Sequence, residues 1–287
     1  MFRKRMMIVG GVLGAALLIV GTALAATIDT AARTVTTPVF NIQFSPTNPE
    51  EISSISWNGS PNLTATGVTS CGDPLEYFGN SWAAPDSANF VSLVGWAQSG
   101  TWGSKNSHSV DIRSVSNSAS GCYGASDIPV QTSYHFWDRG PVVNRIQVQR
   151  KFDFRGAPLT QDFRPYIPRL YPLDGYTEVY HPDASGSLLV METPSACPLG
   201  CQVSDWNGSW FAMHNPTTGQ GVIVRHAPSA YAVNLWVDED SASYTNATGV
   251  LLLQPAGGFT GRVTDTQFMC FYNSSMWSPS LTLPPGC

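Results

Sequence analysis

Apolar and polar residues alternate along Val142-Val-Asn-Arg-Ile-Gln-Val-Gln-Arg-Lys-Phe-Asp-Phe154. Successive side chains of a β-strand point to opposite faces, so this pattern predicts a strand with one buried and one wet face. The buried face takes Ile146, Val148, Phe152 and Phe154, and the wet face takes Arg145, Gln147, Gln149, Lys151 and Asp153. Arg150 falls on the buried side, where it needs a partner. The stretch therefore indicates a sheet that packs on one face.

Similar short segments continue on both sides of this strand. Residues 131–137 precede it across Asp138-Arg-Gly-Pro141, and residues 51–57 run into Asn58-Gly59, a strong hairpin signal, before the pattern resumes at Asn62. Further strands are expected over residues 186–192, 209–215, 221–226, 232–238, 249–254 and 261–272. Beyond residue 25 no window of twelve or more residues shows convincing helical periodicity.

Ten or more short strands without a repeat of 20 to 50 residues predict an all-β fold, a large antiparallel β-sandwich of the supersandwich type. No linker divides the chain, so residues 26–287 are expected to form a single β-sandwich domain. The Ser-, Gly- and Asn-rich residues 103–124 are expected to form a long loop that is tied down by Cys122.

Residues 1–25 have the pattern of a secretory signal peptide. Three cationic residues in Met1-Phe-Arg-Lys-Arg5 precede an apolar run from Met6 to Leu24, and Ala23-Leu-Ala25 fits a cleavage site before Ala26. The run is also long enough for an uncleaved membrane anchor. In both cases the remaining chain is expected outside the cytoplasm, secreted or extracytoplasmic.

Composition agrees with an exported β protein. Charged residues make up 12% of the chain, against about a quarter in typical soluble domains. The net charge of -5 provides no basic field for phosphate backbones, which argues against nucleic acid as a partner. A membrane is expected as a partner only through the N-terminal segment, if it stays uncleaved.

The six cysteines predict a disulfide-stapled domain, because an even number in an exported chain favours bridges. Proximity along the chain suggests Cys197 with Cys201, Cys71 with Cys122, and Cys270 with Cys287, although connectivity does not follow from sequence. A zinc site at Cys197 and Cys201 with nearby histidines is the alternative. We expect the bridges, and therefore no metal and no cofactor.

Three stretches carry a resemblance to a known superfamily: Ile52-Ser-Ser-Ile-Ser-Trp-Asn-Gly-Ser-Pro-Asn-Leu63, Arg164-Pro-Tyr-Ile-Pro-Arg-Leu-Tyr-Pro172 and Trp210-Phe-Ala-Met-His-Asn-Pro-Thr-Thr-Gly-Gln-Gly-Val-Ile-Val224. Their order resembles the galactose-mutarotase-like supersandwiches, which include aldose epimerases and the central domains of polysaccharide lyases. The resemblance implies a supersandwich fold and work on carbohydrates. Mutarotases pair two histidines with a late glutamate, whereas here Glu239 is the last glutamate and His226 the last histidine. The resemblance therefore assigns no catalytic residue.

The nine tryptophans are the strongest indication of function in the sequence. Aromatic rings stack on sugars, so the tryptophans favour a surface that binds a glycan. Trp210, Ala212 and His214 share one face of a strand, which is predicted to line a concave, Trp-lined groove with Trp206. Trp137 is a further candidate ligand contact. The alternative is that these aromatics fill the core.

Five ionisable residues are the candidate catalytic groups: His135, Arg139, Glu178, His181 and His214. An imidazole titrates near neutral pH, and a carboxylate beside it is able to transfer protons. A hydrogen-bonded structural histidine at His135 and a solvated turn at residues 180–183 are the alternatives. The predicted function is that of a secreted protein that binds or processes a glycan or polysaccharide. The alternative function is a non-catalytic extracellular structural or surface protein. Whether the protein is an enzyme stays open.

Overall fold

The structure is a computed structural model. It describes residues 26–29, 31–44, 52–60, 92–99, 107–116, 128–138, 140–155, 166–170, 175–197, 201–227, 232–241, 244–252 and 260–287. Seventeen β-strands and one short 3-10 helix (Pro194–Ala196) make up the regular structure of these residues. Among the described residues, no helix has the length and apolar character needed to cross a membrane. The expectation of an all-β fold is confirmed.

The strands form three antiparallel sheets. The first has the order β1 (Thr27–Asp29), β2 (Thr34–Thr36), β3 (Phe40–Phe44) and β4 (Ile52–Trp57). The second has nine strands in the order β11 (Leu189–Glu192), β10 (Glu178–Pro182), β13 (Trp210–Asn215), β14 (Gln220–His226), β17 (Arg262–Tyr272), β8 (Arg145–Asp153), β7 (Ile128–Trp137), β6 (Ser107–Ser116) and β5 (Ser92–Ser99). The third has the order β12 (Cys201–Val203), β15 (Ala232–Ser241), β16 (Tyr244–Leu252) and β9 (Tyr166–Leu170).

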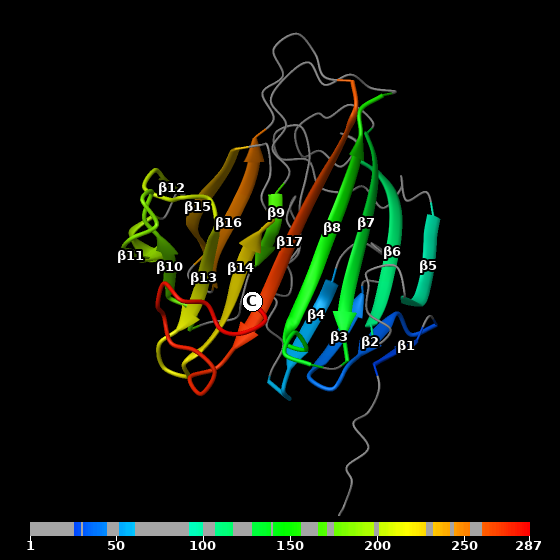
Figure 1. Ribbon diagram of the computed structural model, residues 1–287, viewed down its shortest axis with the longest axis horizontal. Helices are drawn as coiled ribbons and strands as arrows, with labels where there is room; N and C mark the ends of the chain where they lie inside the picture. The colour runs from blue at the N-terminus through cyan, green and yellow to red at the C-terminus, as the bar shows by residue number, and fades with distance from the viewer. Residues whose placement is uncertain are drawn as a thin grey trace, which may run out of the picture.

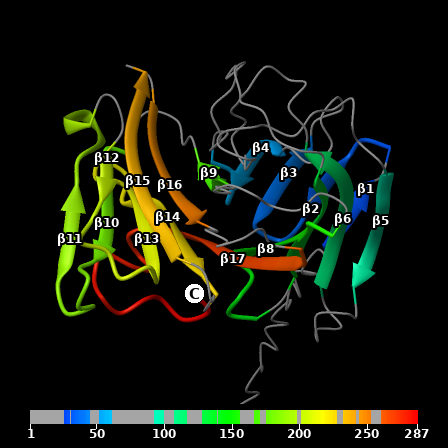
Figure 2. The ribbon, with the colours of Figure 1, turned by 90° about the horizontal axis from the view of Figure 1, so that it is seen from above.

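Both four-stranded sheets pack on the same face of the nine-stranded sheet, which we call the inner face (Figure 2). Its core joins Phe40 and Trp57 of the first sheet and Leu235 of the third to Phe211 and Phe271 of the nine-stranded sheet. Phe40 packs edge-on against Phe271, with ring centroids 4.9 Å apart. The molecule is thus a large antiparallel sandwich, as the strand pattern predicts.

The alternating stretch forms β8 at the middle of the large sheet. Ile146 and Val148 are buried in the inner core, and Gln147 and Gln149 are half-buried on the opposite face. The strand begins at Arg145 rather than Val142, because residues 140–145 form turns in which Val143 N–H donates to the Gly140 carbonyl and Arg145 N–H to that of Val142. The side chains of Arg150 and Phe152 lie outside the described residues.

The Asn58-Gly59 turn is present, with positive φ of 49° and 73° at the two residues. That pair of conformations suits a tight hairpin turn, and the Ser60 N–H donates to the Trp57 carbonyl at 2.9 Å. The strand expected to resume at Asn62 lies outside the described residues. Within them, β4 pairs with the preceding strand, β3.

The prediction of a long loop over residues 103–124 is wrong, because β6 (Ser107–Ser116) lies within these residues. This strand pairs with β5 on one side and β7 on the other. Its serine-rich sequence suggested a loop from composition alone. The ladders on both sides satisfy its backbone groups, so tertiary pairing overrides the local preference.

Two of the three proposed disulfides lie within the described residues. Cys197 is bonded to Cys201 and Cys270 to Cys287. The Cys197–Cys201 bond rules out the alternative of a zinc site at these two sulfurs. Cys71 and Cys122 lie outside the described residues, so their pairing stays a prediction.

The opposite face of the nine-stranded sheet, here called the outer face, is crossed by residues 273–287, which we name the strap. In Figures 1 and 2 this red segment follows β17 and passes over β10, β13 and β14, on the side away from the four-stranded sheets. It closes a second cluster that contains Trp210, Ala212, Ile223, Tyr272 and the strap's Trp277. The large sheet therefore has a cover on each face, and the two covers are of different kinds.

Candidate functional site

One row of residues crosses four neighbouring strands on the outer face. The β-ladders align Glu178 of β10 with His214 of β13, His214 with Gly221 of β14, and Gly221 with Tyr272 of β17. Residues aligned in this way point to the same face, with neighbouring strands about 4.8 Å apart. The row therefore gathers a carboxylate, an imidazole and a phenol from segments distant in sequence.

Gly221 makes room for the contact between Tyr272 and His214. A Cβ at this position would collide with the hydroxyl end of Tyr272. The phenol therefore lies over Gly221 and reaches the next strand, where its hydroxyl and His214 Nδ1 form a 3.0 Å hydrogen bond. The two rings are nearly parallel, at 7°, with centroids 5.9 Å apart.

Tyr180 completes the cluster from the same face of β10. Its hydroxyl donates a 2.8 Å hydrogen bond to Glu178 Oε2, and its ring meets His214 edge-on at a centroid distance of 5.9 Å. Glu178 and Tyr180 are half-buried, whereas His214 is 8% exposed. We call Glu178, Tyr180, His214 and Tyr272 the outer-face cluster.

Burial sets the protonation states of the outer-face cluster. It lowers the pKa of His214 below the usual 6.5, although the nearby Glu178 carboxylate acts in the opposite direction. Burial, with the hydrogen bond and negative charge of Glu178, raises the pKa of Tyr180 to about 12. Burial also raises the pKa of Tyr272 well above its usual range, with further contributions from Tyr176, Tyr180 and Glu178. At neutral pH the cluster thus holds a neutral imidazole and two neutral phenols.

These groups offer varied hydrogen bonding in a small area. A carboxylate accepts hydrogen bonds, and a phenol hydroxyl both donates and accepts them. A neutral imidazole donates a hydrogen bond at one ring nitrogen and accepts one at the other. Tyr272 engages Nδ1 of His214, which leaves Nε2 as the ring nitrogen for a ligand contact. Such a set suits a hydroxyl-rich ligand, and a neutral imidazole beside a carboxylate also suits proton transfer.

The side chains of Trp206 and Trp210, predicted to line one groove, lie apart, and Trp210 is covered. Trp210 is 5% exposed and meets Trp277 of the strap edge-on, with centroids 6.0 Å apart. Trp206 contacts Phe211 and His226, which belong to the inner face, and its indole N–H donates to the Trp210 carbonyl at 2.9 Å. The side chains of Trp206 and Trp210 therefore do not share one surface.

His135 and Trp137 lie elsewhere on the outer face, on β7. Their rings are 4.4 Å apart, and the guanidinium of Arg145 lies 4.5 Å from the centre of the Trp137 ring. Four strand-to-strand steps, about 19 Å, separate β7 from the β13 that carries His214. Both side chains are buried, and Arg139 lies outside the described residues.

His181 belongs to the inner face, three residues along β10 from Glu178. An odd spacing on a strand sends the two side chains to opposite faces, so the expected carboxylate-imidazole neighbours are not these two. His181 Nε2 instead lies 3.5 Å from Glu192 Oε1 of β11. Asp183 accepts hydrogen bonds from the Ser187 and Leu188 N–H groups, which makes it a residue of the β10–β11 turn.

Sequence reasoning missed Tyr180, Gly221 and Tyr272. Tyr180 sits two residues from Glu178, and that spacing was a usable signal for a shared face. Tyr272 and Gly221 had no such signal, because only the registers of β13, β14 and β17 place them beside His214.

No protein-family model and no curated protein matches this sequence. Among solved structures, the chain is similar to Slr1438 of Synechocystis sp. PCC 6803, with 8% identity, a TM-score of 0.50, and 82% of this chain and 93% of that one covered. At this identity the likeness shows that the two chains share a fold and shows nothing of their function.

Two further likenesses have lower TM-scores. The heparan sulfate lyase HepC of Pedobacter heparinus has 10% identity and a TM-score of 0.45, and this chain, 84% of which is covered, spans 33% of that one. HI1317 has 9% identity and a TM-score of 0.46, with 83% of this chain and 91% of that one covered. Similarity at this level carries no conclusion about site or substrate.

Proposed function

We propose that the protein is a secreted, carbohydrate-recognising β-sandwich that contacts a glycan through Glu178, Tyr180 and His214 on the outer face. The observation that carries the proposal is the row that joins these residues to Tyr272 across four strands. It supplies varied hydrogen-bonding groups beside aromatic rings, a combination that suits sugar ligands.

The proposal moves the ligand surface away from Trp210. A residue that is 5% exposed beneath Trp277 offers little surface to a sugar. Glu178 and Tyr180 are half-buried at the β10 side of the sheet, so part of each side chain stays open to solvent. A ligand approaching there meets the carboxylate and the phenol first.

Glycan-array binding of the chain from residue 26 onward tests this proposal. We expect a specific glycan to be retained, with about tenfold or greater loss in Glu178→Gln, because hydrogen bonds to charged groups contribute about 1.5–3 kcal/mol. Glu192→Gln is the matched control, since Glu192 is a half-buried glutamate on the inner face of the adjacent strand. Equal binding by both variants, or loss of binding in both, would contradict the assignment.

A non-catalytic structural or surface protein is the second candidate, and one observation favours it. Trp57, Trp137, Trp210 and Trp277 are each at most 7% exposed, as expected of aromatics that stabilise a core. A folded chain that binds nothing on a broad array would favour this candidate.

The export proposal rests on residues 1–25, which lie outside the described part of the structure. Disulfide bonds are compatible with an extracellular protein. We expect the mature chain to begin at Ala26 as a single domain. N-terminal sequencing of the protein from the producing cell tests this, and a start at Met1 would indicate the uncleaved anchor.

A further inference from the structure

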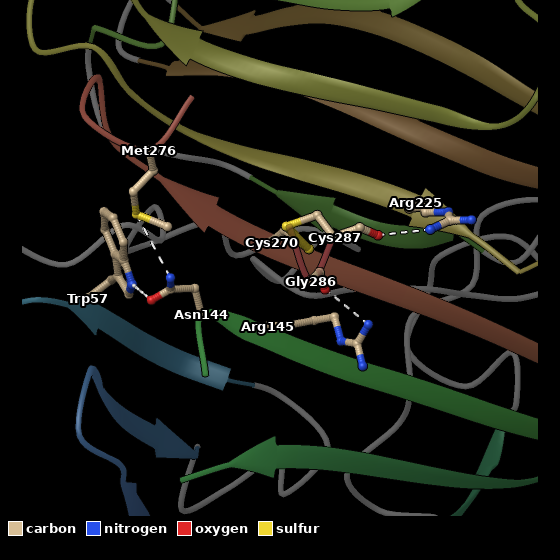
Figure 3. Close-up of a disulfide and its surroundings, with 8 residues drawn as sticks. All are labelled: Trp57, Asn144, Arg145, Arg225, Cys270, Met276, Gly286 and Cys287. Carbon is tan, nitrogen blue, oxygen red and sulfur yellow. Dashed lines mark hydrogen bonds between the residues drawn. A yellow bond between two sulfur atoms is a disulfide. The ribbon is translucent and has the colours of Figure 1, made fainter. Parts of the chain in front are cut away.

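The far end of the strap is held to the sheet by a disulfide and by two hydrogen bonds from arginine side chains. Cys287 forms the disulfide with Cys270 of β17. The Arg225 guanidinium of β14 donates a 2.8 Å hydrogen bond to the Cys287 carbonyl, and the Arg145 guanidinium of β8 donates a 3.1 Å hydrogen bond to that of Gly286. Figure 3 shows these contacts around the disulfide. The strap's end is therefore clamped to three adjacent strands.

Arg145 is itself fixed in place. Its guanidinium lies between two aromatic rings, 4.5 Å from the centre of Trp137 and 4.7 Å from that of Phe268. Stacking of this kind holds a planar guanidinium in one orientation. The clamp therefore has a rigid partner on the sheet, and not only a flexible surface cation.

Between its two ends, the strap places Trp277 on the outer face. The Trp277 ring meets Tyr272 edge-on at a centroid distance of 4.7 Å and Trp210 at 6.0 Å. Its indole N–H donates to the strap's own Thr282 carbonyl at 2.8 Å, which closes the strap on itself. Because Tyr272 bonds His214, Trp277 covers the ring that positions the imidazole of the outer-face cluster.

We propose that the strap is a covalently latched cover, and that its release uncovers an aromatic strip of Trp210 and Tyr272 continuous with Tyr180 and Glu178. The strip would extend the glycan surface, so this part of the inference rests on the proposed function. The latch itself does not depend on that function. The four-stranded sheets keep the inner core closed when the strap leaves, because they pack on the opposite face.

Release needs a dithiol reductant. The dithiol supplies two electrons and two protons, the Sγ–Sγ bond of Cys270 and Cys287 breaks to leave two thiols, and the reductant becomes a disulfide. Cys270 is fully buried, whereas Cys287 is half-buried, so we expect the reductant to attack the Cys287 sulfur.

Hydrogen exchange on the full chain tests the latch. The double variant Cys270→Ala/Cys287→Ala lacks the latch, and Cys197→Ala/Cys201→Ala is the matched control. We expect the backbone amides at positions 277 and 287, which donate to the Asn273 and Pro284 carbonyls in the wild type, to exchange about 100-fold faster in the first variant. The β8 and β17 amides should stay protected. The control should leave strap exchange within about threefold of wild type.

Strap exchange that is unchanged in the first variant, or equally raised in both variants, would overturn the latch. Loss of protection in β8 and β17 would also overturn it, since it would mean global unfolding. Wild-type protein treated with dithiothreitol gives a second reading, in which strap protection should fall at the same dose that reduces Cys270–Cys287.

Glycan binding separates the two proposals. Wild-type binding with no change in strap exchange would leave the proposed function standing and overturn the latch. Faster strap exchange without glycan binding in either state would establish the latch and overturn the glycan assignment. Faster strap exchange together with stronger binding by Cys270→Ala/Cys287→Ala would support both.

Discussion

Phe271 and Tyr272 are consecutive residues of β17 that serve the two faces of the same sheet. Phe271 points to the inner face, where it packs against Phe40 and Trp57 of the first sheet. Tyr272 points to the outer face, where it bonds His214 and lies under Trp277 of the strap. The inner cover consists of two sheets whose apolar side chains join one core, whereas the outer cover is a single segment held by aromatic contacts, hydrogen bonds and a disulfide.

The comparison indicates that the two faces of the sheet have different roles. On the inner face, apolar burial spread over many strands stabilises the fold. On the outer face, the cluster of Glu178, Tyr180, His214 and Tyr272 depends on individual hydrogen bonds and on a glycine. Substitutions on the inner face should therefore change global stability most, and those on the outer face should mainly change the geometry of the cluster.

The largest effect is expected from Phe271→Ala. Removal of a buried phenylalanine should lower the free energy of unfolding by about 3–5 kcal/mol, from lost burial and the cavity left behind. Urea unfolding followed by circular dichroism measures this. Met191→Ala, at a side chain that is 49% exposed, should change it by less than about 0.5 kcal/mol. A loss below about 1.5 kcal/mol for Phe271→Ala would argue against a core carried by the inner face.

The next largest effect is expected from Gly221→Ala, which should lower the free energy of unfolding by about 1–3 kcal/mol because of overpacking. The new methyl group would collide with Tyr272, so the phenol must leave His214. The imidazole resonances of His214 in an NMR spectrum should shift in this variant. Unperturbed His214 resonances would show that Tyr272 does not need the space over Gly221.

Tyr272→Phe should lower the free energy of unfolding by about 1 kcal/mol. The loss should rise to about 3 kcal/mol if His214 Nδ1 is left without a hydrogen-bond partner. The ring and its packing on Trp277 remain, so the loss reports on the hydroxyl alone. Urea unfolding of this variant beside Tyr176→Phe, at a buried phenol of the inner core, gives the comparison. A stabilised Tyr272→Phe protein would mean that the hydrogen bond to His214 is not favourable.

The smallest effect is expected in the pH dependence of stability. Burial lowers the pKa of His214 in the folded state below 6.5, so the unfolded chain binds this proton more readily. The contribution of His214 is therefore present above about pH 6.5 and is lost as the pH falls through the folded-state pKa. We expect a shallower loss of stability between pH 8 and pH 5 in His214→Gln than in wild type. Identical slopes would contradict a lowered pKa.

Local patterns predicted much of this structure from the sequence. The alternation over residues 145–153, the Asn58-Gly59 turn and two disulfides follow from neighbours along the chain, and each is present. The strand β6 was missed because residues 103–124 are rich in Ser, Gly and Asn, a composition typical of loops, whereas pairing with β5 and β7 holds the strand in the sheet.

The candidate site was harder to predict, because it depends on register between distant strands. His214 and Glu178 were named from residue type alone, without any means of placing them in one row. The covering of Trp210 by Trp277 was not foreseeable from sequence, since no local pattern says over which strands residues 273–287 run. Non-local pairing therefore decides which candidates meet.

The strand order also bears on biosynthesis. The late strand β17 lies between β14 and β8, so it joins the half of the nine-stranded sheet built from β5 to β8 to the half built from β10 to β14. A growing chain exposes two unpaired strand edges until β17 emerges, and such edges promote aggregation. Folding of this sheet is therefore completed only after β17 (Arg262–Tyr272) has been made, and termination before residue 262 leaves two halves with no strand to connect them.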